Sequence, residues 1–458
     1  MSYIREHWSR SKSYRVLLTL AVIYALLRLA IQIFLFSDAM RPEAVAEGVQ
    51  VSADLQQSYI ASAQHFQARE DLYLKGSLEH VEAHYLYSPA FAFFFSPLLL
   101  LPLQILLPLM LVIHVLAYGL LYIWWHWIFE KNRLPHIARQ WARLLPLYLV
   151  FSVFWDDLSY MNTYIIIALF ATLLIDAILQ EKLGWASFWL GAVILPIKPH
   201  WAFALALPLL LGRYRFFLKL LVGAAVAYLV VAGITILAGG VEYGVRQYQD
   251  YFGFLSRLTR DYPWWGPDKP FLGYNHSVLQ VVLYFLGVST ANMSLATILK
   301  LILLLPLGWV SLKLLRNPAE RLGKESPEIA LALVFVLYLG AFIWLDMVWE
   351  LSLGIVIFAY LLATSERKGI RLLLWLLFGP YALLDIWRLI SYMSLGDNVL
   401  YEGAYVLTDP LIYIPWILMV LIVFYGILLL RLNSFLTVRQ ASLEKYPPAL
   451  QNTQKNTS

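Results

Sequence analysis

Polar and charged side chains interrupt the long apolar runs of this sequence at four places, and these side chains are the ones that could do chemistry. In the first, VSADLQQSYIASAQHFQAREDLY at 51–73, Asp54 opens an amphipathic helix that also carries Tyr59 on its apolar face. A carboxylate beside apolar surface can accept a proton as a general base. Asp54 and Gln57 also have the spacing of a capping box, so the carboxylate has a structural interpretation as a helix N-cap.

The second place is FWDDLSYMNTY at 154–164, a short turn between two apolar runs. Asp156 and Asp157 can cap the next helix or bind a cation, and paired acids in so small a turn are more often structural. Asn162 has the same two interpretations.

The third place is ILPIKPHWAF at 194–203, where Lys198 and His200 lie beside Pro196 and Pro199. Proline removes a backbone donor and breaks a helix, which is tolerated at membrane depth only against protein or a wet cavity. A lysine in such a break is expected to have an anionic partner, and an ammonium suits a phosphate. The alternative is a lysine that extends to the outer membrane surface.

The fourth place is the loop at 242–276, EYGVRQYQDYFGFLSRLTRDYPWWGPDKPFLGYNH, which mixes cations with aromatic rings. Its tyrosines and tryptophans are in part the aromatic belt that anchors membrane proteins at the interface. The mixture, with Arg246, Arg257, Arg260 and Lys269 among the rings, also fits a surface for a sugar and a phosphate headgroup.

The elements that must position these residues lie in a membrane. Of the 458 residues, 61% are hydrophobic and only 14% are charged, against about 25% charged in soluble domains. The mean hydropathy is +0.68. We therefore expect an all-α polytopic membrane protein with a single domain at 1–432 and a disordered polar tail at 433–458. The absence of cysteine excludes disulfides and thiolate chemistry.

The apolar runs predict a bundle of about 12 transmembrane helices, several of them too short to cross as ideal helices. Shorter apolar pieces at 85–102 and 276–290 are expected to be half-helices or interfacial helices on the outer side. The predicted crossings are near 15–36, 104–128, 144–155, 163–180, 185–197, 199–211, 216–238, 295–315, 328–345, 351–365, 371–391 and 410–432.

The distribution of charge predicts the orientation of this layout. Segments assigned to the inside hold 23 of the 34 Lys and Arg residues and 8 of the 29 Asp and Glu residues. Cytoplasmic loops near membrane spans are rich in Lys and Arg. We therefore expect a multi-pass protein of the inner or plasma membrane with both termini in the cytoplasm and its polar chemistry outside.

Three further groups have weaker signals. Asp385 and Arg388 are three residues apart in one span and are expected to pair with each other. Arg28, in the first span, can pair across helices or belong to a relay. His80 and His84 are four residues apart but have no further ligands nearby, so no metal site is predicted.

The order of these motifs resembles that of the GT-C membrane glycosyltransferases, and more narrowly the GT87 group of polyprenyl-phosphate-mannose-dependent mannosyltransferases. The resemblance covers roughly residues 15 to 365. It rests on the order and sidedness of motifs that are each weak alone: Asp54 with Tyr59, the YLYSP stretch at 85–89 with SPLLLLP at 96–102, Met161-Asn162, Lys198-Pro199 and Asn275-His276-Ser277.

Three departures from the family pattern affect what the resemblance implies. Ser88 replaces the first of two prolines, and Tyr160-Met161 stands where Gly-Gln is frequent. A histidine that follows a tryptophan near the ninth or tenth span is absent, because Trp349 is followed by Glu350. Glu350 or His276 would have to take the role of that histidine.

The resemblance implies transfer of a sugar, by inversion, from a polyprenyl-phosphate donor to a lipid or glycan acceptor, with no metal or cofactor and no nucleic acid. Asp54 would be the catalytic base, and Lys198 with arginines of the 242–276 loop would stabilise the leaving phosphate. The remaining expected substrate-binding residues are Tyr59, Tyr87, Asn162, His200, Asn275, His276 and Glu350.

Two other functions compete with this one. A transporter or flippase for a lipid-linked or anionic substrate would use Arg28, Lys198 and Asp176 as its path. Such proteins often have internal repeats and polar sites near the middle of the membrane, whereas here no repeat is visible and the candidate groups gather on one face. An envelope polymerase or ligase with a lipid diphosphate donor would also face outward.

Overall fold

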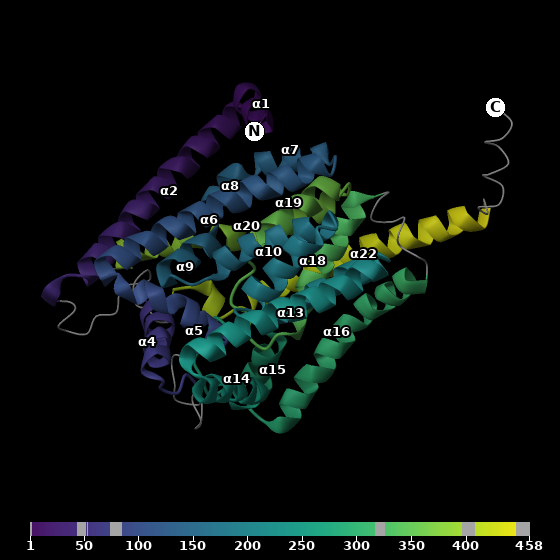
Figure 1. The fold of residues 1–458 in the computed structure, drawn as a ribbon. Helices are drawn as coiled ribbons and strands as arrows, with labels where there is room; N and C mark the ends of the chain where they lie inside the picture. The colour runs from purple at the N-terminus through teal and green to yellow at the C-terminus, as the bar shows by residue number, and fades with distance from the viewer. Residues whose placement is uncertain are drawn as a thin grey trace.

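The computed structural model describes residues 2–43, 52, 54–73, 85–316, 326–395 and 408–445. All regular secondary structure in these ranges is helical. Figure 1 shows the long helices lying side by side as one bundle, with shorter helices between them and at one end. An all-α membrane protein is thus confirmed. His80 and His84 lie outside the described residues.

Seven helices among the described residues are long and apolar enough to cross a membrane, or eight if one bent pair is a single span. This number is smaller than the 12 crossings that the sequence predicts. The seven candidates are α2 (Lys12–Ala39), α6 (Leu103–Lys131), α13 (Tyr214–Gly239), α16 (Thr290–Arg316), α18 (Pro327–Trp344), α20 (Lys368–Ala382) continued into α21 (Leu384–Leu395), and α22 (Trp416–Lys445).

The missing crossings are present as helices, but these helices are short. A hydrocarbon core of about 30 Å needs about 20 helical residues at 1.5 Å per residue, whereas α19 has 11. The short apolar elements are α5 (Pro89–Phe95) with η2 (Ser96–Leu100), α11 (Leu183–Ser187) with η3 (Phe188–Ile194), η4 (Pro199–Leu205) with α12 (Ala206–Leu210), and α19 (Gly354–Thr364).

The bent pair is formed by α8 (Leu145–Leu149) and α9 (Ser152–Tyr160), followed by α10 (Tyr164–Leu179) at an angle of 115°. Met161 ends α9 in the left-handed conformation, with φ of 53°. The carboxylate of Asp157 then accepts hydrogen bonds from the N–H groups of Tyr164 and Ile165, at 3.0 and 3.1 Å. Asp157 therefore caps α10, one of its two expected roles, and the turn between the helices presents Asn162.

The two prolines at 196 and 199 produce a second break. Helix η3 ends at Ile194 and η4 begins at Pro199, with Lys198 between them. Gly191 lets η3 approach α13 closely, because a Cβ atom at this position would lie 2.2 Å from the carbonyl oxygen of Ala224. Close packing against a long helix thus fixes the segment that leads to Lys198.

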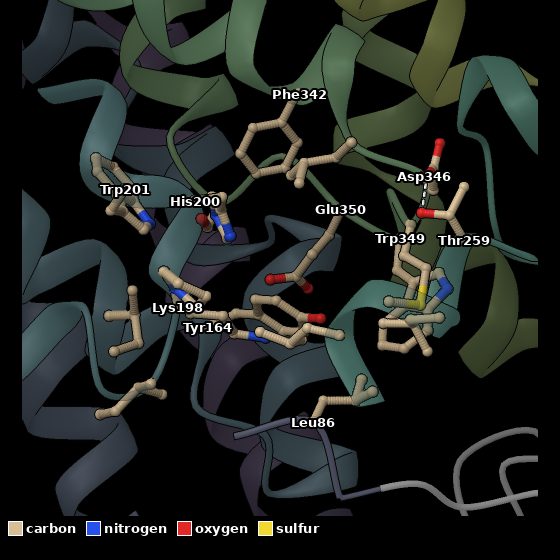
Figure 2. Close-up of a pocket in the computed structure, with 18 of the residues that line it drawn as sticks. Leu86, Tyr164, Lys198, His200, Trp201, Thr259, Phe342, Asp346, Trp349 and Glu350 are labelled. Atoms are coloured by element: carbon tan, nitrogen blue, oxygen red, sulfur yellow. Dashed lines mark hydrogen bonds between the residues drawn. The ribbon is translucent and has the colours of Figure 1, made fainter. Parts of the chain in front are cut away.

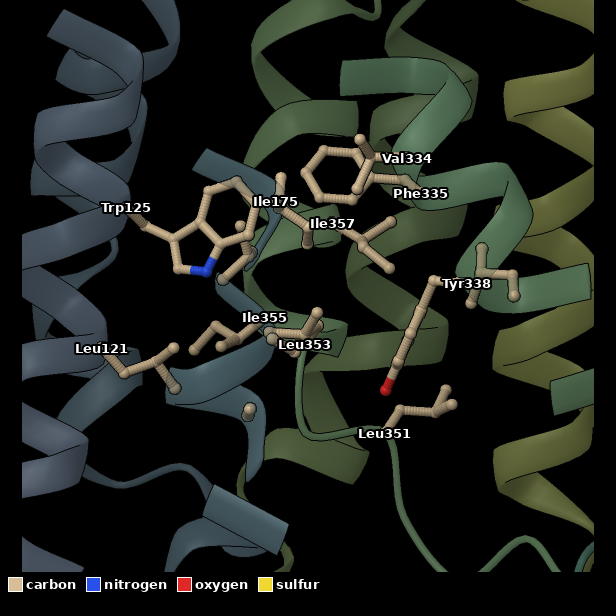
Figure 3. Close-up of a cluster of buried hydrophobic side chains, with 14 of the residues drawn as sticks. Leu121, Trp125, Ile175, Val334, Phe335, Tyr338, Leu351, Leu353, Ile355 and Ile357 are labelled. Atoms are coloured by element: carbon tan, nitrogen blue, oxygen red, sulfur yellow. The ribbon is translucent and has the colours of Figure 1, made fainter. Parts of the chain in front are cut away.

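The buried core lies where α6, α10, α18 and α19 meet. Figure 3 shows Trp125 and Leu121 of α6 facing Phe335 of α18 and Ile357 of α19. Trp125, Leu121, Phe335 and Ile357 all have an exposed fraction of 0%. The long helices α2, α13 and α16 instead expose many large apolar side chains, as expected of helices that face lipid.

The predicted pairing of Asp385 with Arg388 is wrong, because the two residues belong to two different buried ion networks. Asp385 pairs with Arg28 of α2, with 3.1 Å between Nε and Oδ2. Arg388 instead pairs with Asp156 of α9 and, at 2.7 Å, with Asp409. The three-residue spacing of Asp385 and Arg388 contains no information about partners that other helices supply. The expectation that Arg28 can pair across helices is confirmed.

The remaining helices gather at the two ends of the long ones (Figure 1). At one end, α1 (Ser2–Arg10) contacts α7 (Pro135–Arg143). At the other end lie η1 (Asp54–Ile60), α4 (Ala61–Ala68), α14 (Val241–Asp261), α15 (Val278–Leu286) and η5 (Pro410–Ile412). Helix α22 continues to Lys445, 13 residues past the predicted end of the domain, and residues 446–458 lie outside the described part.

Candidate functional site

A cavity of about 230 Å³ lies beside the break between η3 and η4. Its walls come from that break, from α10, from α14 and from the segment between α18 and α19. Figure 2 shows Lys198, His200 and Glu350 around it, with the carboxylate of Glu350 directed at the ring of Tyr164. Polar groups from four distant parts of the sequence therefore meet at one place.

Lys198 contributes a positive charge without a counter-ion in contact. Its Nζ lies 4.2 Å from the centre of the Tyr164 ring and 5.1 Å from that of Tyr87. Within the described part of the chain, no hydrogen bond or ion pair reaches this nitrogen. Burial lowers the pKa of Lys198 to about 8, against the raising effect of Asp54 and Glu350. The ammonium is thus placed to receive an anion.

Asp54 lies in η1, beside Lys198 but not among the residues that line the cavity. Its Oδ2 accepts a hydrogen bond from Nδ2 of Asn162 at 2.7 Å. Burial raises the pKa of Asp54 to about 6, while Lys198 and the amide of Asn162 oppose the rise. The carboxylate is thus oriented by one amide and has a pKa near neutrality, which suits a general base.

Two tyrosines, Tyr59 and Tyr87, extend this hydrogen-bonded group. The hydroxyl of Tyr59 donates to Oδ1 of Asn162 at 3.2 Å and lies 3.3 Å from the hydroxyl of Tyr87. Tyr59 is fully buried and Tyr87 is 5% exposed. The structure therefore brings Asp54, Tyr59, Tyr87, Asn162 and Lys198 together.

The helix that begins near Asp54 is capped by another residue. Ser52 Oγ accepts the N–H of Leu55 at 3.5 Å, and Oε1 of Gln56 accepts the N–H of Ser52 at 3.2 Å. These two contacts satisfy backbone N–H groups at the start of the helix. Because Ser52 satisfies the start of the helix, the carboxylate of Asp54 turns toward Asn162.

Glu350 lies between α18 and α19 and is 9% exposed. Its Oε1 is buried, and no hydrogen-bond partner for this oxygen exists among the described residues. Burial raises the pKa of Glu350 well above its usual value, and the nearby Asp157 raises it further. This carboxyl group therefore faces the cavity without a donor to stabilise its charge.

Asn275 and His276 hold the segment that carries Glu350. Oδ1 of Asn275 accepts the N–H of Val348 at 3.0 Å, and Nδ2 donates to the carbonyl of Asp346 at 3.0 Å. The N–H of His276 donates to the carbonyl of Val348 at 2.8 Å. Neither side chain lines the cavity, so the geometry gives them a positioning role.

The imidazole of His276 is occupied on both sides. Its Nδ1 accepts the N–H of Ile417 at 3.1 Å, so Nε2 carries the proton and donates to the carbonyl of Leu411 at 2.8 Å. Burial lowers the pKa of His276 to about 4. His200 does line the cavity, where burial and Lys198 lower its pKa to about 3. Both rings are neutral near pH 7.

The predicted arginines lie on α14 but not in the cavity wall. Arg260 pairs with Asp261 on the surface, with 2.6 Å between Nε and Oδ1. Arg257 is half-buried, and neither arginine lines the cavity, although Leu258 and Thr259 of the same helix do. Among the described residues, Lys198, and not Arg257 or Arg260, supplies the positive charge in the cavity wall.

Sequence reasoning missed two groups of the site. Tyr164, under the ammonium of Lys198, ends the polar turn FWDDLSYMNTY and could have been found there. Asp346 accepts a hydrogen bond from Thr259 at 2.7 Å and pairs with Lys300 of α16 (Figure 2 for the first contact). Thr259, Asp346 and Lys300 come from three separate regions of the chain, so no spacing in the sequence predicts that they meet.

Comparisons with protein families, curated proteins and solved structures found no match for this chain. The function of the site must therefore be inferred from its own side chains. The site combines an available ammonium, an oriented carboxylate of near-neutral pKa and a buried carboxyl group beside a small cavity. Such a set can bind an anionic headgroup and remove a proton from a nearby hydroxyl.

Proposed function

We propose that this protein is a membrane glycosyltransferase of the GT-C type. It moves a sugar from a polyprenyl-phosphate donor to a lipid or glycan acceptor on the outer face of the membrane. The observation that carries the proposal is the ammonium of Lys198, which has no counter-ion in contact and lies over two tyrosine rings beside the oriented carboxylate of Asp54. Mannose as the sugar follows from the resemblance of the motifs.

In the proposed reaction, the acceptor hydroxyl oxygen attacks the anomeric carbon of the sugar. Asp54 accepts the hydroxyl proton, and Asn162 holds its carboxylate in position. The bond from the anomeric carbon to the phosphate oxygen breaks on the opposite side, and its electron pair leaves with the polyprenyl phosphate. The configuration of the sugar inverts.

Lys198 stabilises the negative charge that develops on the leaving phosphate. An ammonium within a partly desolvated site does so more strongly than one in water. A monophosphate leaving group can be neutralised by side chains, so the proposed reaction is written without a metal ion or cofactor.

The proposed arrangement in the membrane follows from the charge distribution. The site end of the long helices, with η1, α4 and α14, would face outward from the inner or plasma membrane, and both termini would be cytoplasmic. The helices η1 and α4 would form the first outer loop of the GT-C bundle. Their apolar residues Leu55, Tyr59 and Ala63 are fully buried, so this loop is fixed against the protein.

Specific contacts weaken the transporter alternative. Arg28 is engaged with Asp385, Gln32 and Ser159. Asp176 lies at the other end of α10, where it accepts a hydrogen bond from Gln180 and lies 3.8 Å from Lys131. Neither Arg28 nor Asp176 lines the cavity with Lys198. A continuous path through these three residues has no support.

A transfer assay with the purified protein in liposomes tests the proposal. Polyprenyl-phosphate mannose with a labelled sugar serves as donor, and total membrane lipids and glycans serve as acceptors. The expected result is a labelled product that falls about 100-fold or more in Lys198→Ala, the scale of a lost transition-state charge contact. Absence of product from this donor, with product from a lipid diphosphate sugar, would favour the polymerase or ligase alternative.

A further inference from the structure

Lys198 has more carboxyl groups around it than one cation can balance. The charged or titratable groups facing Glu350 are Lys198 and His200 from the η3–η4 break, Asp54 from η1, Asp156 and Asp157 from α9, Asp346 from its own segment, and the phenols of Tyr164, Tyr338 and Tyr381. Asp156 is paired with Arg388 and Asp346 with Lys300. Three carboxyl groups, those of Asp54, Asp157 and Glu350, remain opposite the ammonium of Lys198, and Asp157 also lies 3.7 Å from the imidazole of His114.

The hydrogen-bond partners of these three groups differ. Asp157 accepts two backbone N–H groups at the start of α10, and Asp54 accepts the amide of Asn162. Such donors favour the ionised form of a carboxyl group. Oε1 of Glu350 is buried and has no donor among the described residues. An unpaired buried charge is far more costly than a buried neutral acid, so Glu350 is the group that retains a proton.

The direction of the Glu350 side chain allows its carboxyl proton to form a hydrogen bond in the cavity. Glu350 points into the cavity beside Lys198 (Figure 2), and the ammonium does not neutralise it by contact, since no carboxylate of the described residues lies within 4 Å of Nζ. An ionised Glu350 would repel any anion that Lys198 attracts. A neutral carboxylic acid would instead offer an O–H donor to that anion.

We propose that Glu350 is held as a neutral carboxylic acid and donates a hydrogen bond to the phosphate that Lys198 binds. The phosphate is thus held by one ammonium and one acid hydroxyl, which makes Glu350 a binding residue for the anionic headgroup. This inference rests on the proposed function for the identity of the anion as a lipid phosphate.

Infrared difference spectroscopy and binding of farnesyl phosphate test the inference on the full-length protein in nanodiscs. At pH 7 the parent is expected to show a protonated carboxyl band that is lost in Glu350→Gln. Glutamine also donates from this position, so Glu350→Gln is expected to bind farnesyl phosphate within about threefold of the parent. Glu350→Ala loses one hydrogen bond to a charged group and is expected to bind about 10- to 100-fold more weakly.

Glu242→Gln is the matched control, because Glu242 is exposed at the start of α14 and lies outside the cavity wall. It should keep both the band and the affinity. If Glu350→Ala does not fold, the band and the Glu350→Gln affinity still decide the matter. Farnesol, which lacks the phosphate, controls for the apolar chain.

Two results would overturn the inference. One is a parent spectrum without a band assignable to Glu350, and the other is binding that becomes tenfold tighter or more in Glu350→Gln, which indicates a repelling carboxylate in the parent. If the parent does not bind farnesyl phosphate, the anion part fails together with the proposed donor class. If band and binding behave as expected but no sugar is transferred, the proposed function alone fails.

Discussion

Asn162 donates its side-chain N–H to Asp54 at 2.7 Å while the oxygen of the same amide accepts the hydroxyl of Tyr59 at 3.2 Å. The second contact fixes which end of the amide faces Asp54. Asp54 therefore receives a donor from a residue 108 positions away, and its carboxylate is oriented by a side chain that the bend between α9 and α10 presents.

The first prediction concerns Asp54 as the general base. Asp54→Asn removes the proton acceptor and is expected to lower the transfer rate about 100-fold or more. Because Ser52 makes the helix cap, the unfolding temperature should stay close to that of the parent. The check is a transfer assay combined with thermal unfolding. Glu70→Gln, at an exposed acid after α4, is the control that should keep full activity; a fully active Asp54→Asn would transfer the role of base to another group.

The second prediction concerns Asn162. Its amide stabilises the ionised form of Asp54, so Asn162→Ala should raise the pKa of Asp54 further. The acidic limb of the rate profile should then move to higher pH, and the rate on the plateau should fall by about tenfold, the scale of one lost hydrogen bond to a charged group. An unchanged acidic limb with a lower plateau would mean that Asn162 acts only on folding.

The third prediction is a bell-shaped dependence of transfer on pH. The carboxyl of Asp54 has a raised pKa of about 6, so activity should rise with pH as this group loses its proton near that value. The ammonium of Lys198 has a lowered pKa of about 8, so activity should fall as pH rises through that value and the charge disappears. Rates measured from pH 5 to 10 at constant ionic strength provide the check.

Lys198→Arg separates the two limbs. Arginine stays protonated over this whole range, so the alkaline fall assigned to Lys198 should move to higher pH while the acidic limb stays in place. The absolute rate should fall, because the planar guanidinium does not reproduce the geometry of the ammonium. An alkaline limb that does not move in this variant would assign it to a different group.

The fourth prediction concerns stability at the network around Arg28. Arg28→Gln leaves the buried carboxylate of Asp385 without its cation and is expected to destabilise the protein by about 3–5 kcal/mol. The double variant with Asp385→Asn should recover most of that loss, since both charges are then gone. Thermal unfolding in detergent measures both; equal stability of the single variant and the parent would contradict the pairing.

The fifth prediction concerns sidedness. The chain has no cysteine, so single cysteines can be labelled without background. A cysteine at Asp268, which is exposed near the site end, should react with an impermeant thiol reagent in intact cells. A cysteine at Ser9, at the opposite end, should react only after the membrane is opened. The reverse pattern would place the site inside the cell.

The sequence predicted helical elements well because apolar runs, prolines and turn residues act locally. Nearly every predicted crossing coincides with a helix, and the break at Lys198 lies where its two prolines place it. Seven or eight of the 12 predicted crossings have helices long enough to span a membrane among the described residues, since an apolar run of 11 or 12 residues can be buried in the protein instead of spanning lipid. Hydropathy alone does not distinguish a helix buried in the protein from a helix that spans lipid; the length and the burial of the helix do.

Side-chain partners were harder to predict. The pairing of Asp385 with Arg388 failed because each has a closer opposite charge on another helix, and local spacing contains no information about helix packing. Asp157 was correctly considered as a helix cap, since capping is a local interaction. The position of Glu350 in the cavity wall depends on contacts of its segment with Asn275, which lies 75 residues earlier in the chain.

The shortness of α19 determines how deep the cavity lies. The hydroxyl of Tyr360 donates to the carbonyl of Glu328 at 3.0 Å, which places these residues of α19 and α18 at one level. From that level α18 rises about 24 Å to Trp344, whereas α19 begins only about 9 Å above it, at Gly354. The segment that carries Glu350 thus joins the end of the 18-residue helix α18 to the start of the 11-residue helix α19. On the proposed function, the sugar–phosphate bond would be drawn below the headgroup layer, where hydrolysis would lack its water and the acceptor must insert its own hydroxyl.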